Sequence, residues 1–298
     1  MWVKSSWNIS VIVEPTKTAN LLIEALPYIQ QFAGKTIVVK YGGNALAGAT
    51  DDDALGAFAK DIALLHAVGI KPVVVHGGGP QISALMERLG KTPTFHNGLR
   101  VTDAETMEIV SMVLLGTVNP QIVSAVNLHG APAVGVSGHD AKMFVVAPRD
   151  QQLGFVGDIT KVDATIVKEL LADSRVPVVA TLGSHSSGQA YNINADTAAG
   201  ALAQALGAEK LIYLTDIDGL RTNKSDPSSI VRQATTSQLR TMLASGSIEG
   251  GMIPKIESCI AAIDRGVHRG HILDGRIAHV LLLELFTDSG VGTMVSKG

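Results

Sequence analysis

The stretch Thr36-Ile37-Val38-Val39-Lys40-Tyr41-Gly42-Gly43 is a short β-branched run that ends abruptly in glycine. Pro72-Val73-Val74-Val75-His76 enters Gly77-Gly78-Gly79 in the same way, and apolar runs at 133–136, 176–181 and 211–214 also stop at small or polar residues. Continuous apolar strands separated by helical periodicity are typical of a parallel sheet that is buried on both faces. The sequence therefore predicts an α/β fold, a three-layer sandwich around a largely parallel central sheet.

The composition excludes several classes of protein. The 298 residues are 46% hydrophobic and 17% charged, which indicates a globular chain rather than a disordered or coiled-coil one. A net charge of -3 gives no general attraction to nucleic acid or to an anionic membrane. No apolar stretch approaches the roughly 20 residues of a membrane span. A single cysteine, Cys259, indicates a reducing compartment, and we expect the cytoplasm.

The chain divides into three parts. Residues 16–32 form an amphipathic segment before the first strand, with Pro27 inside it, which predicts a kinked helix. Such a helix packs either on its own domain or on a second subunit. A second helix start follows Asn194, so we expect the boundary between two lobes there. The predicted parts are an N-terminal segment of residues 1–34, a first lobe of residues 35–195 and a second lobe of residues 196–298.

Two lysines occupy positions that suit an anion. Lys40 ends an apolar strand just before glycine, and ligands of parallel sheets bind at that edge. Lys255 falls in the first turn of a helix, where a cation opposes the helix dipole unless an anion shares the site. The alternative for Lys40 is a side chain that reaches the surface.

Polar side chains on three segments are candidates for holding a ligand. Arg100, on a loop before a helix, is suited to bind a carboxylate in a bidentate manner, although a surface arginine is the plainer reading. Asn192 and Asn194 alternate on one face of an extended segment, and Asp196 follows them at a helix start. Asn194 and Asp196 are equally well explained as helix caps.

Three common glycine-loop chemistries lack their motifs. The sequence contains neither G-x-G-x-x-G nor G-x-x-x-x-G-K-[ST], which disfavours a Rossmann dehydrogenase and a P-loop NTPase. His76-Gly77-Gly78-Gly79 is similar to an esterase oxyanion segment, but the G-x-S-x-G elbow is missing.

The chain resembles the amino acid kinase family from about residue 35 to its end. The matching segments appear in family order: Val39-Lys40-Tyr41-Gly42-Gly43-Asn44-Ala45, Val75-His76-Gly77-Gly78-Gly79-Pro80-Gln81, Asn97-Gly98-Leu99-Arg100-Val101-Thr102, Asn192-Ile193-Asn194-Ala195-Asp196, Leu214-Thr215-Asp216-Ile217-Asp218-Gly219-Leu220 and Gly251-Met252-Ile253-Pro254-Lys255. The Asn-Gly-Leu-Arg-Val-Thr segment is particular to the branch that acts on N-acetyl-L-glutamate.

The resemblance implies ATP-dependent phosphorylation of the side-chain carboxylate of N-acetyl-L-glutamate, the second step of arginine biosynthesis. By similarity, Lys40, Lys255 and Asp196 are catalytic. Gly78, Gly79, Arg100, Asn192 and Asn194 would bind the substrate. ATP would be bound by Gly43, Thr215, Asp216, Asp218, Leu220 and Lys255. Mg²⁺ would be held mainly by the ATP phosphates, with no metal site on the protein.

Near the N-terminus, Leu26-Pro27-Tyr28-Ile29 resembles the kinked helix of the arginine-inhibited, hexameric branch of the family. Near the C-terminus, the effector region of that branch is similar to Gly266-Val267-His268-Arg269-Gly270-His271, Leu282-Leu283-Glu284-Leu285-Phe286-Thr287 and Gly290-Val291-Gly292-Thr293. The resemblance implies that L-arginine is an effector, that Tyr28, His268, Glu284 and Gly290 lie near it, and that the chain forms a homohexamer built as a trimer of dimers. His268 and His271 are expected to be a surface pair rather than metal ligands.

Two other functions stay open from the sequence. One is an amino acid kinase that acts on glutamate or aspartate. The other is a catalytically silent, arginine-responsive binding protein, although two lysines and Asp196 together serve no purpose in a pure sensor.

Overall fold

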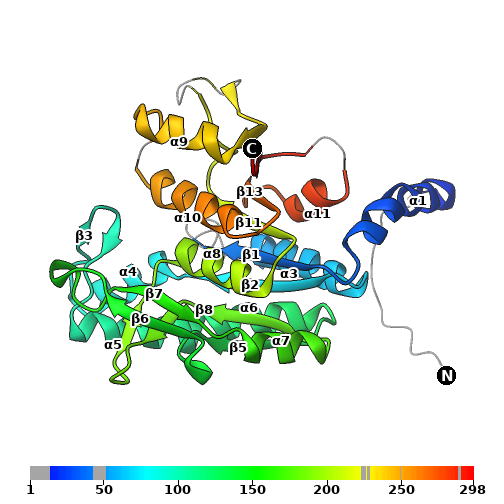
Figure 1. Ribbon diagram of the computed structural model, residues 1–298. Helices are drawn as coiled ribbons and strands as arrows, with labels where there is room; N and C mark the ends of the chain where they lie inside the picture. The colour runs from blue at the N-terminus through cyan, green and yellow to red at the C-terminus, as the bar shows by residue number, and fades with distance from the viewer. Residues whose placement is uncertain (1–13, 43–51, 223–225, 227–228, 249, 288–289) are drawn as a thin grey trace, which may run out of the picture.

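An eight-stranded sheet forms the centre of the molecule (Figure 1). The computed structural model describes residues 14–42, 52–222, 226, 229–248, 250–287 and 290–298. Neighbouring strands of the sheet are parallel except β13 and β14, which are antiparallel. In spatial order the strands are β12 (Gln233–Thr235), β14 (Thr293–Ser296), β13 (Arg269–Asp274), β11 (Lys210–Thr215), β1 (Thr36–Tyr41), β2 (Lys71–His76), β8 (Val176–Ala180) and β5 (Ala133–Ser137).

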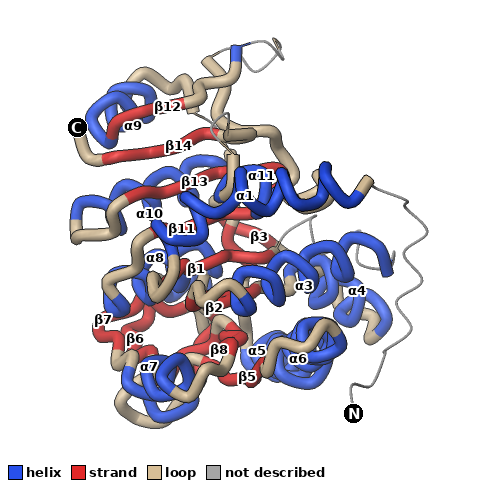
Figure 2. Tube along the Cα trace, turned by 90° about the vertical axis from the view of Figure 1, so that its right-hand side faces the viewer, coloured by secondary structure: helices blue, strands red, loops and turns tan. Residues whose placement is uncertain are grey.

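The central strands are buried on both faces, which explains why their sequences are continuously apolar. Along β1, Ile37 and Val39 belong to one hydrophobic cluster and Val38 belongs to the other. Helices cover each cluster, so the molecule has the three layers that the sequence predicts (Figure 2). The predicted largely parallel sheet is confirmed.

The two helical layers divide by the cluster that they cover. Helices on the first cluster are α3 (Asp52–Ala67), α4 (Gly79–Arg88), α5 (Ala104–Val113), α6 (Asn119–Leu128) and α11 (Val280–Leu285). Helices on the second cluster are α7 (Thr165–Ala172), α8 (Ala195–Leu206), α9 (Thr236–Ala244) and α10 (Met252–Asp264).

Two small sheets supplement the central one. A four-stranded sheet has the order β10 (Ala190–Asn192), β9 (Leu182–Ser184), β6 (Phe144–Pro148) and β7 (Gly157–Val162). A short hairpin pairs β3 (Phe95–His96) with β4 (Leu99–Arg100). Arg100 and Asn192, two predicted ligand residues, therefore end strands of these small sheets.

Strands from both predicted lobes share the central sheet. β1 pairs with β11 in the register Ile37 to Lys210, so the two lobes meet at the middle of one sheet. Helix α8 begins at Ala195, where the sequence places the boundary. The division into lobes at residues 195 and 196 stays a prediction.

Helix α1 (Pro15–Phe32) projects from the body of the molecule at the right of Figure 1. It continues through Pro27 as one helix, and Phe32 is its buried residue. Leu21, Leu22 and Ile23 are exposed. A helix with so little contact to its own chain leaves an apolar surface uncovered.

A continuous helix from Ala104 to Leu128 departs from the sequence expectation about membrane-length segments. It consists of α5, a π-helical turn η2 (Leu114–Val118) and α6, and by length and composition alone it is long and apolar enough to cross a membrane. In the structure α6 packs against α3 and β5. Buried residues of this helix, such as Val110 and Ile122, belong to the hydrophobic core, whereas Leu128 is exposed.

Candidate active site

Two lysine side chains from opposite halves of the chain meet at one carboxylate. Lys40 Nζ lies 3.0 Å from Asp196 Oδ1, and Lys255 Nζ donates a hydrogen bond of 3.0 Å to Asp196 Oδ2. All three side chains are buried. Lys40 is on β1, Asp196 is in the first turn of α8, and Lys255 is in the first turn of α10. The structure thus brings together the three residues that the sequence singles out as catalytic.

The charges in this group leave one positive charge in excess. Burial raises the pKa of Asp196, but the two ammonium groups outweigh it and lower the pKa to about 2. Burial lowers the pKa of Lys255, and Asp196 opposes that shift. An ionised Asp196 between two ammonium groups gives a buried site with a net charge near +1, which favours an anion.

Glycines leave room around the lysines. A Cβ at Gly42 would lie 3.2 Å from Lys40 Nζ and 3.5 Å from Gly77 N, and a Cβ at Gly77 would lie 3.3 Å from the Cβ of Ala195. The ends of β1 and β2 and the start of α8 therefore lie against one another beside the two ammonium groups. Gly43, which the sequence assigns to ATP, lies outside the described residues.

The loop after β2 leads into the start of α4. Gly78 precedes this helix, and a Cβ there would lie 2.8 Å from Leu114 Cδ2, whereas a Cβ at Gly79 would meet nothing within 4 Å. The close packing of the π-helical turn thus leaves no room for a side chain at Gly78, whereas there is room for one at Gly79. A helix N-terminus next to two ammonium groups is a strong arrangement for a phosphate.

A hydrogen-bonded chain fixes the backbone of Asp196. Ser258 Oγ donates to the carbonyl oxygen of Asp196 at 2.7 Å and lies 2.9 Å from Tyr213 Oη. The Tyr213 ring lies 5.6 Å from Lys255 Nζ, where its face attracts the cation. Tyr213 and Ser258 have no motif, and the sequence analysis missed them.

Arg100 is a buried guanidinium without a carboxylate partner in the described part of the chain. Nη2 donates to the Gly79 carbonyl at 2.9 Å and to Ser83 Oγ at 2.7 Å, and the Arg100 guanidinium lies 4.8 Å from the Phe95 ring. Burial lowers its pKa. The partners of this buried charge in the described ranges are neutral groups, which favours an anion at the site.

Two asparagines have different roles. Asn194 Oδ1 accepts from the backbone N–H groups of Asp196 and Thr197, both at 3.0 Å, so this side chain caps α8. Asn192 Nδ2 donates to Thr102 Oγ1 at 3.3 Å, and Thr102 Oγ1 donates to the Arg100 carbonyl. Asn192 is therefore linked to Arg100, whereas Asn194 acts first on the helix that carries Asp196.

A cavity of about 660 Å³ lies in the second half of the chain, next to the start of α10. Its walls include Asp216, Asp218 and Leu220 from the segment after β11, and Met252 from the first turn of α10. Thr215, which ends β11, donates from Oγ1 to Asp216 Oδ1 at 3.2 Å. Three of the residues that the sequence assigns to ATP thus line one cavity, and its size fits a nucleotide.

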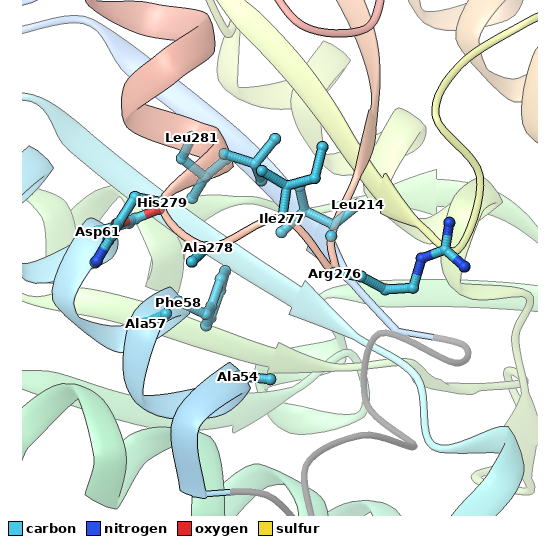
Figure 3. A pocket seen from close by; sticks show the side chains of 12 residues that line it. Ala54, Ala57, Phe58, Asp61, Leu214, Arg276, Ile277, Ala278, His279 and Leu281 are labelled. Carbon is cyan, nitrogen blue, oxygen red and sulfur yellow. The ribbon is translucent and has the colours of Figure 1, made fainter. Parts of the chain in front are cut away.

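A smaller cavity of about 200 Å³ lies between α3 and the turn after β13 (Figure 3). Phe58 and Leu281 line it, and Asp61 forms a short contact of 2.6 Å with His279 Nδ1. Arg276 borders both cavities, and in Figure 3 its side chain extends away from the others. The walls of this cavity are largely apolar, and the carboxylate of Asp61 is already bound to His279. The smaller cavity is therefore a poor site for a phosphate.

The residues assigned to an effector fall in two places. The side chain of Glu284 is 7% exposed, accepts from Val291 N at 2.9 Å and lies 2.7 Å from His271 Nδ1. A Cβ at Gly290 would lie 3.3 Å from its carboxylate. His268 is exposed and lies 3.1 Å from Glu209 Oε2. The expectation of a surface pair is wrong for His271, because β13 carries its ring into the core beside Glu284.

Lys210 extends this buried group toward α1. Its Nζ lies 3.2 Å from His271 Nε2 and 4.9 Å from the ring of Phe32. Burial lowers the pKa of Lys210 to about 8. Tyr28, on the same helix as Phe32, packs against the neighbouring core. The sequence analysis missed Lys210 because it opens an apolar strand without any motif.

Comparisons with known proteins agree on one family. The model of the amino acid kinase family matches residues 35–274. The chain is 51% identical over 288 residues to the acetylglutamate kinase of Symbiobacterium thermophilum, which covers 94% of this chain and 97% of the relative.

Two solved structures of the N-acetylglutamate synthase of Neisseria gonorrhoeae are also similar. The complex with coenzyme A and N-acetyl-glutamate is 30% identical with a TM-score of 0.82, and covers 94% of this chain and 63% of the synthase. The complex with coenzyme A and L-arginine is 28% identical with a TM-score of 0.78, and covers 94% and 65%. This chain thus spans somewhat less than two thirds of the synthase. The family model and the curated relative together show that the chain belongs to the amino acid kinase family, among the acetylglutamate kinases.

Proposed function

We propose that this protein transfers the γ-phosphoryl group of ATP to the side-chain carboxylate of N-acetyl-L-glutamate. This is the reaction for which its acetylglutamate kinase relatives are named, and we assign it to arginine biosynthesis. The observation that carries the proposal is the meeting of Lys40 and Lys255 at Asp196. A cavity of nucleotide size borders the first turn of α10, which carries Lys255, and a buried arginine without a carboxylate partner among the described residues lies at the start of α4.

The chemistry explains why cations are the essential groups. A side-chain carboxylate with a pKa near 4.3 is already ionised at neutral pH, so no general base is required. The obstacle is repulsion between two anions, about 4 kcal/mol for unit charges roughly 4 Å apart at an effective dielectric near 20. Lys40 and Lys255 reduce this repulsion, and Asp196 keeps both ammonium groups in place.

The substrate carboxylate that does not react needs a separate partner. Arg100 supplies a planar guanidinium at the start of α4, and Asn192 is linked to it through Thr102. Gly78 and Gly79 begin α4 next to this arginine, and their N–H groups suit the acyl or phosphoryl oxygens.

Mg²⁺ fits the site as a companion of the nucleotide. In the described ranges no three acidic, histidine or cysteine side chains come together to hold a metal ion. Asp216 and Asp218 line the larger cavity, and their carboxylates would be available to a cation bound to ATP phosphates. Mg²⁺ supplies charge neutralisation on those phosphates.

The decisive experiment traps the product. Purified protein is incubated with ATP, Mg²⁺, N-acetyl-L-glutamate and hydroxylamine, which converts an acyl phosphate to a coloured hydroxamate. We expect hydroxamate with N-acetyl-L-glutamate and little with glutamate or aspartate. A larger signal with glutamate or aspartate would move the substrate assignment. No signal with any of the three would support the catalytically silent binding protein.

We also propose that L-arginine inhibits the enzyme by binding at Glu284. This buried carboxylate lies beside Gly290 and in contact with His271, and Lys210 connects the group to Phe32 of α1. A carboxylate at this position suits a guanidinium, which it binds in a bidentate manner. The similar synthase structure that contains L-arginine supports an arginine site in this fold. His268 lies on the surface, so His271 replaces it in the proposed site.

The proposed assembly is a homohexamer in the cytoplasm, built as a trimer of dimers through α1. Exposed Leu21, Leu22 and Ile23 give this helix an apolar surface that its own chain does not cover. The lone buried Cys259 is in keeping with a reducing compartment.

A further inference from the structure

His76 ends β2 directly before the glycine loop, and its imidazole is completely buried. Nδ1 lies 3.0 Å from the carbonyl oxygen of Gly77, and Nε2 lies 3.0 Å from Nδ2 of Asn119. Neither side chain belongs to the site as described above. Both ring nitrogens have a partner, so the ring is held in one orientation.

Asn119 determines which ring nitrogen carries the proton. Its Nδ2 lies 2.9 Å from the Val178 carbonyl oxygen, which only accepts hydrogen bonds, so the atom that faces it must be the amide nitrogen. The same nitrogen therefore donates to His76 Nε2. His76 Nε2 is then unprotonated, and Nδ1–H is the donor to Gly77. Burial lowers the pKa of His76 to about 4, which keeps this neutral form at physiological pH.

The surroundings of Asn119 hold its amide in this orientation. A Cβ at Gly135 would lie 2.0 Å from Asn119 Oδ1, so the amide oxygen occupies space that only a glycine leaves open. Asn119 opens α6 immediately after the π-helical turn, and Leu114 and Val118 of that turn contact Gly78. The asparagine and the wall of the glycine loop thus belong to one continuous helix.

The bond to Gly77 sets the direction of the next N–H group. In a trans peptide the N–H of Gly78 points opposite to the carbonyl of Gly77. His76 therefore holds that N–H away from the imidazole. Within the described residues no group accepts the N–H of Gly78. As far as the described residues go, this donor is held in place and is available to a ligand.

We propose that His76, in its Nδ1–H form fixed by Asn119, is a positioning residue that orients the Gly78 N–H toward the transferring group. This inference rests on the proposed kinase activity. Its chemical consequence is that the donor does not need to reorient as negative charge develops.

Two substitutions of His76 distinguish a role in orienting the Gly78 N–H from a role in stabilising the fold alone. In His76→Asn the amide nitrogen takes the place of Nδ1 and still donates to Gly77. In His76→Gln the longer side chain reaches the place of Nε2 and still accepts from Asn119, but Gly77 loses its donor. Both variants lose one of the two buried hydrogen bonds, so we expect similar decreases in the midpoint of thermal unfolding.

The kinetic expectation differs between the two variants. His76→Gln lowers kcat by about 10- to 100-fold, the effect of a misplaced group in a reacting site, while KM for both substrates changes little. His76→Asn stays within about threefold of the wild type. Asparagine and glutamine at half-buried His129 are the matched controls and leave kcat unchanged. Equal losses in the two His76 variants, or full activity in His76→Gln, would overturn the proposal.

A second measurement does not require activity or a variant that is fully stable. ¹⁵N NMR of histidine-labelled, unliganded wild-type protein distinguishes a protonated Nδ1 from a protonated Nε2, and the His76 signals are those missing from His76→Asn. We expect the Nδ1–H form throughout pH 6 to 8. A protonated Nε2 would overturn the inference even if the enzyme is active, whereas an inactive wild type with the Nδ1–H form would instead contradict the proposed kinase function.

Discussion

Asp196 Oδ2 accepts a hydrogen bond from Lys255 Nζ at 3.0 Å, and this contact joins the first turns of α8 and α10. Both helices therefore direct their N-termini, which carry partial positive charge, toward one place. Lys40 adds a further positive group from β1. One buried carboxylate allows these groups to coexist without ligand, and an incoming phosphate supplies the remaining negative charge.

Replacing Lys255 by methionine tests the catalytic role of this cation. Methionine keeps most of the side-chain volume and removes the charge, so the fold is retained while the transferring phosphoryl group loses a stabilising contact. We expect kcat to fall by about 10²- to 10³-fold. Lys60→Met, at an exposed lysine on α3, is the matched control and leaves kcat unchanged. Turnover near the wild-type value in Lys255→Met would refute the role.

Acid titration of stability tests the charge of Asp196. Its pKa falls from 3.8 to about 2 on folding, so the ionised form contributes stability above pH 4 that is lost as the pH falls toward 2. The free energy of unfolding of Asp196→Asn lacks this contribution at every pH. We expect the difference in the free energy of unfolding between wild type and variant to narrow by about 2 kcal/mol as the pH falls from about 4 to about 2. Urea unfolding at several pH values measures the gap, and a constant gap would contradict a depressed pKa.

Arg100→Lys tests the substrate side of the site. Lysine keeps the charge but loses the planar fork that binds a carboxylate and contacts Gly79 and Ser83. We expect KM for N-acetyl-L-glutamate to rise by about 10- to 100-fold and KM for ATP to stay unchanged. Arg88→Lys, at an exposed arginine at the end of helix α4, serves as control. Equal increases in both KM values would assign Arg100 to the fold rather than to the substrate.

The sequence predicted the catalytic group more completely than the surfaces around it. Lys40 and Lys255 were identifiable because each breaks a local rule: a cation ends an apolar strand, and a cation opposes a helix dipole. An ammonium group in such a position needs a partner of opposite charge, and Asp196 is the partner of both lysines. Parallel strand order then brings the separate segments to one edge of the sheet, which the repeated strand and glycine pattern implied.

Residues without a local anomaly were not predictable. Asn119 and Ser258 read as ordinary helix residues, and their roles arise only from neighbours that are distant in the sequence. His271 was expected at the surface together with His268, but β13 is buried from Gly270 to Asp274, and the His271 ring lies inside the protein. Burial of a strand on both faces depends on the elements that pack on it, and no motif in the sequence marked β13 as such a strand.

Glu284→Gln tests the proposed inhibition by L-arginine. The substitution keeps the size of the side chain and removes the negative charge that pairs with a guanidinium. We expect basal kcat to change little, because Glu284 lies on α11 beside His271 rather than at the catalytic group, and the concentration of L-arginine for half inhibition to rise by about 100-fold. Initial rates over an L-arginine titration give this value. Exposed Glu87→Gln, on α4, is the control. Unchanged sensitivity would remove Glu284 from the effector site, and a wild type insensitive to L-arginine would remove the proposed regulation.

Changing the exposed face of α1 tests the proposed assembly. Leu22 and Ile23 are 65% and 67% exposed, so replacing both by glutamine costs little within one subunit but removes apolar area from a contact between subunits. We expect light scattering to show a hexamer for the wild type and a dimer for the double variant, with kcat retained because the catalytic group lies on other elements. Lys17→Gln, an exposed residue on the same helix, is the control that keeps the wild-type mass. If α1 instead packs only on its own subunit, both variants keep that mass, and the interface must lie elsewhere on the molecule.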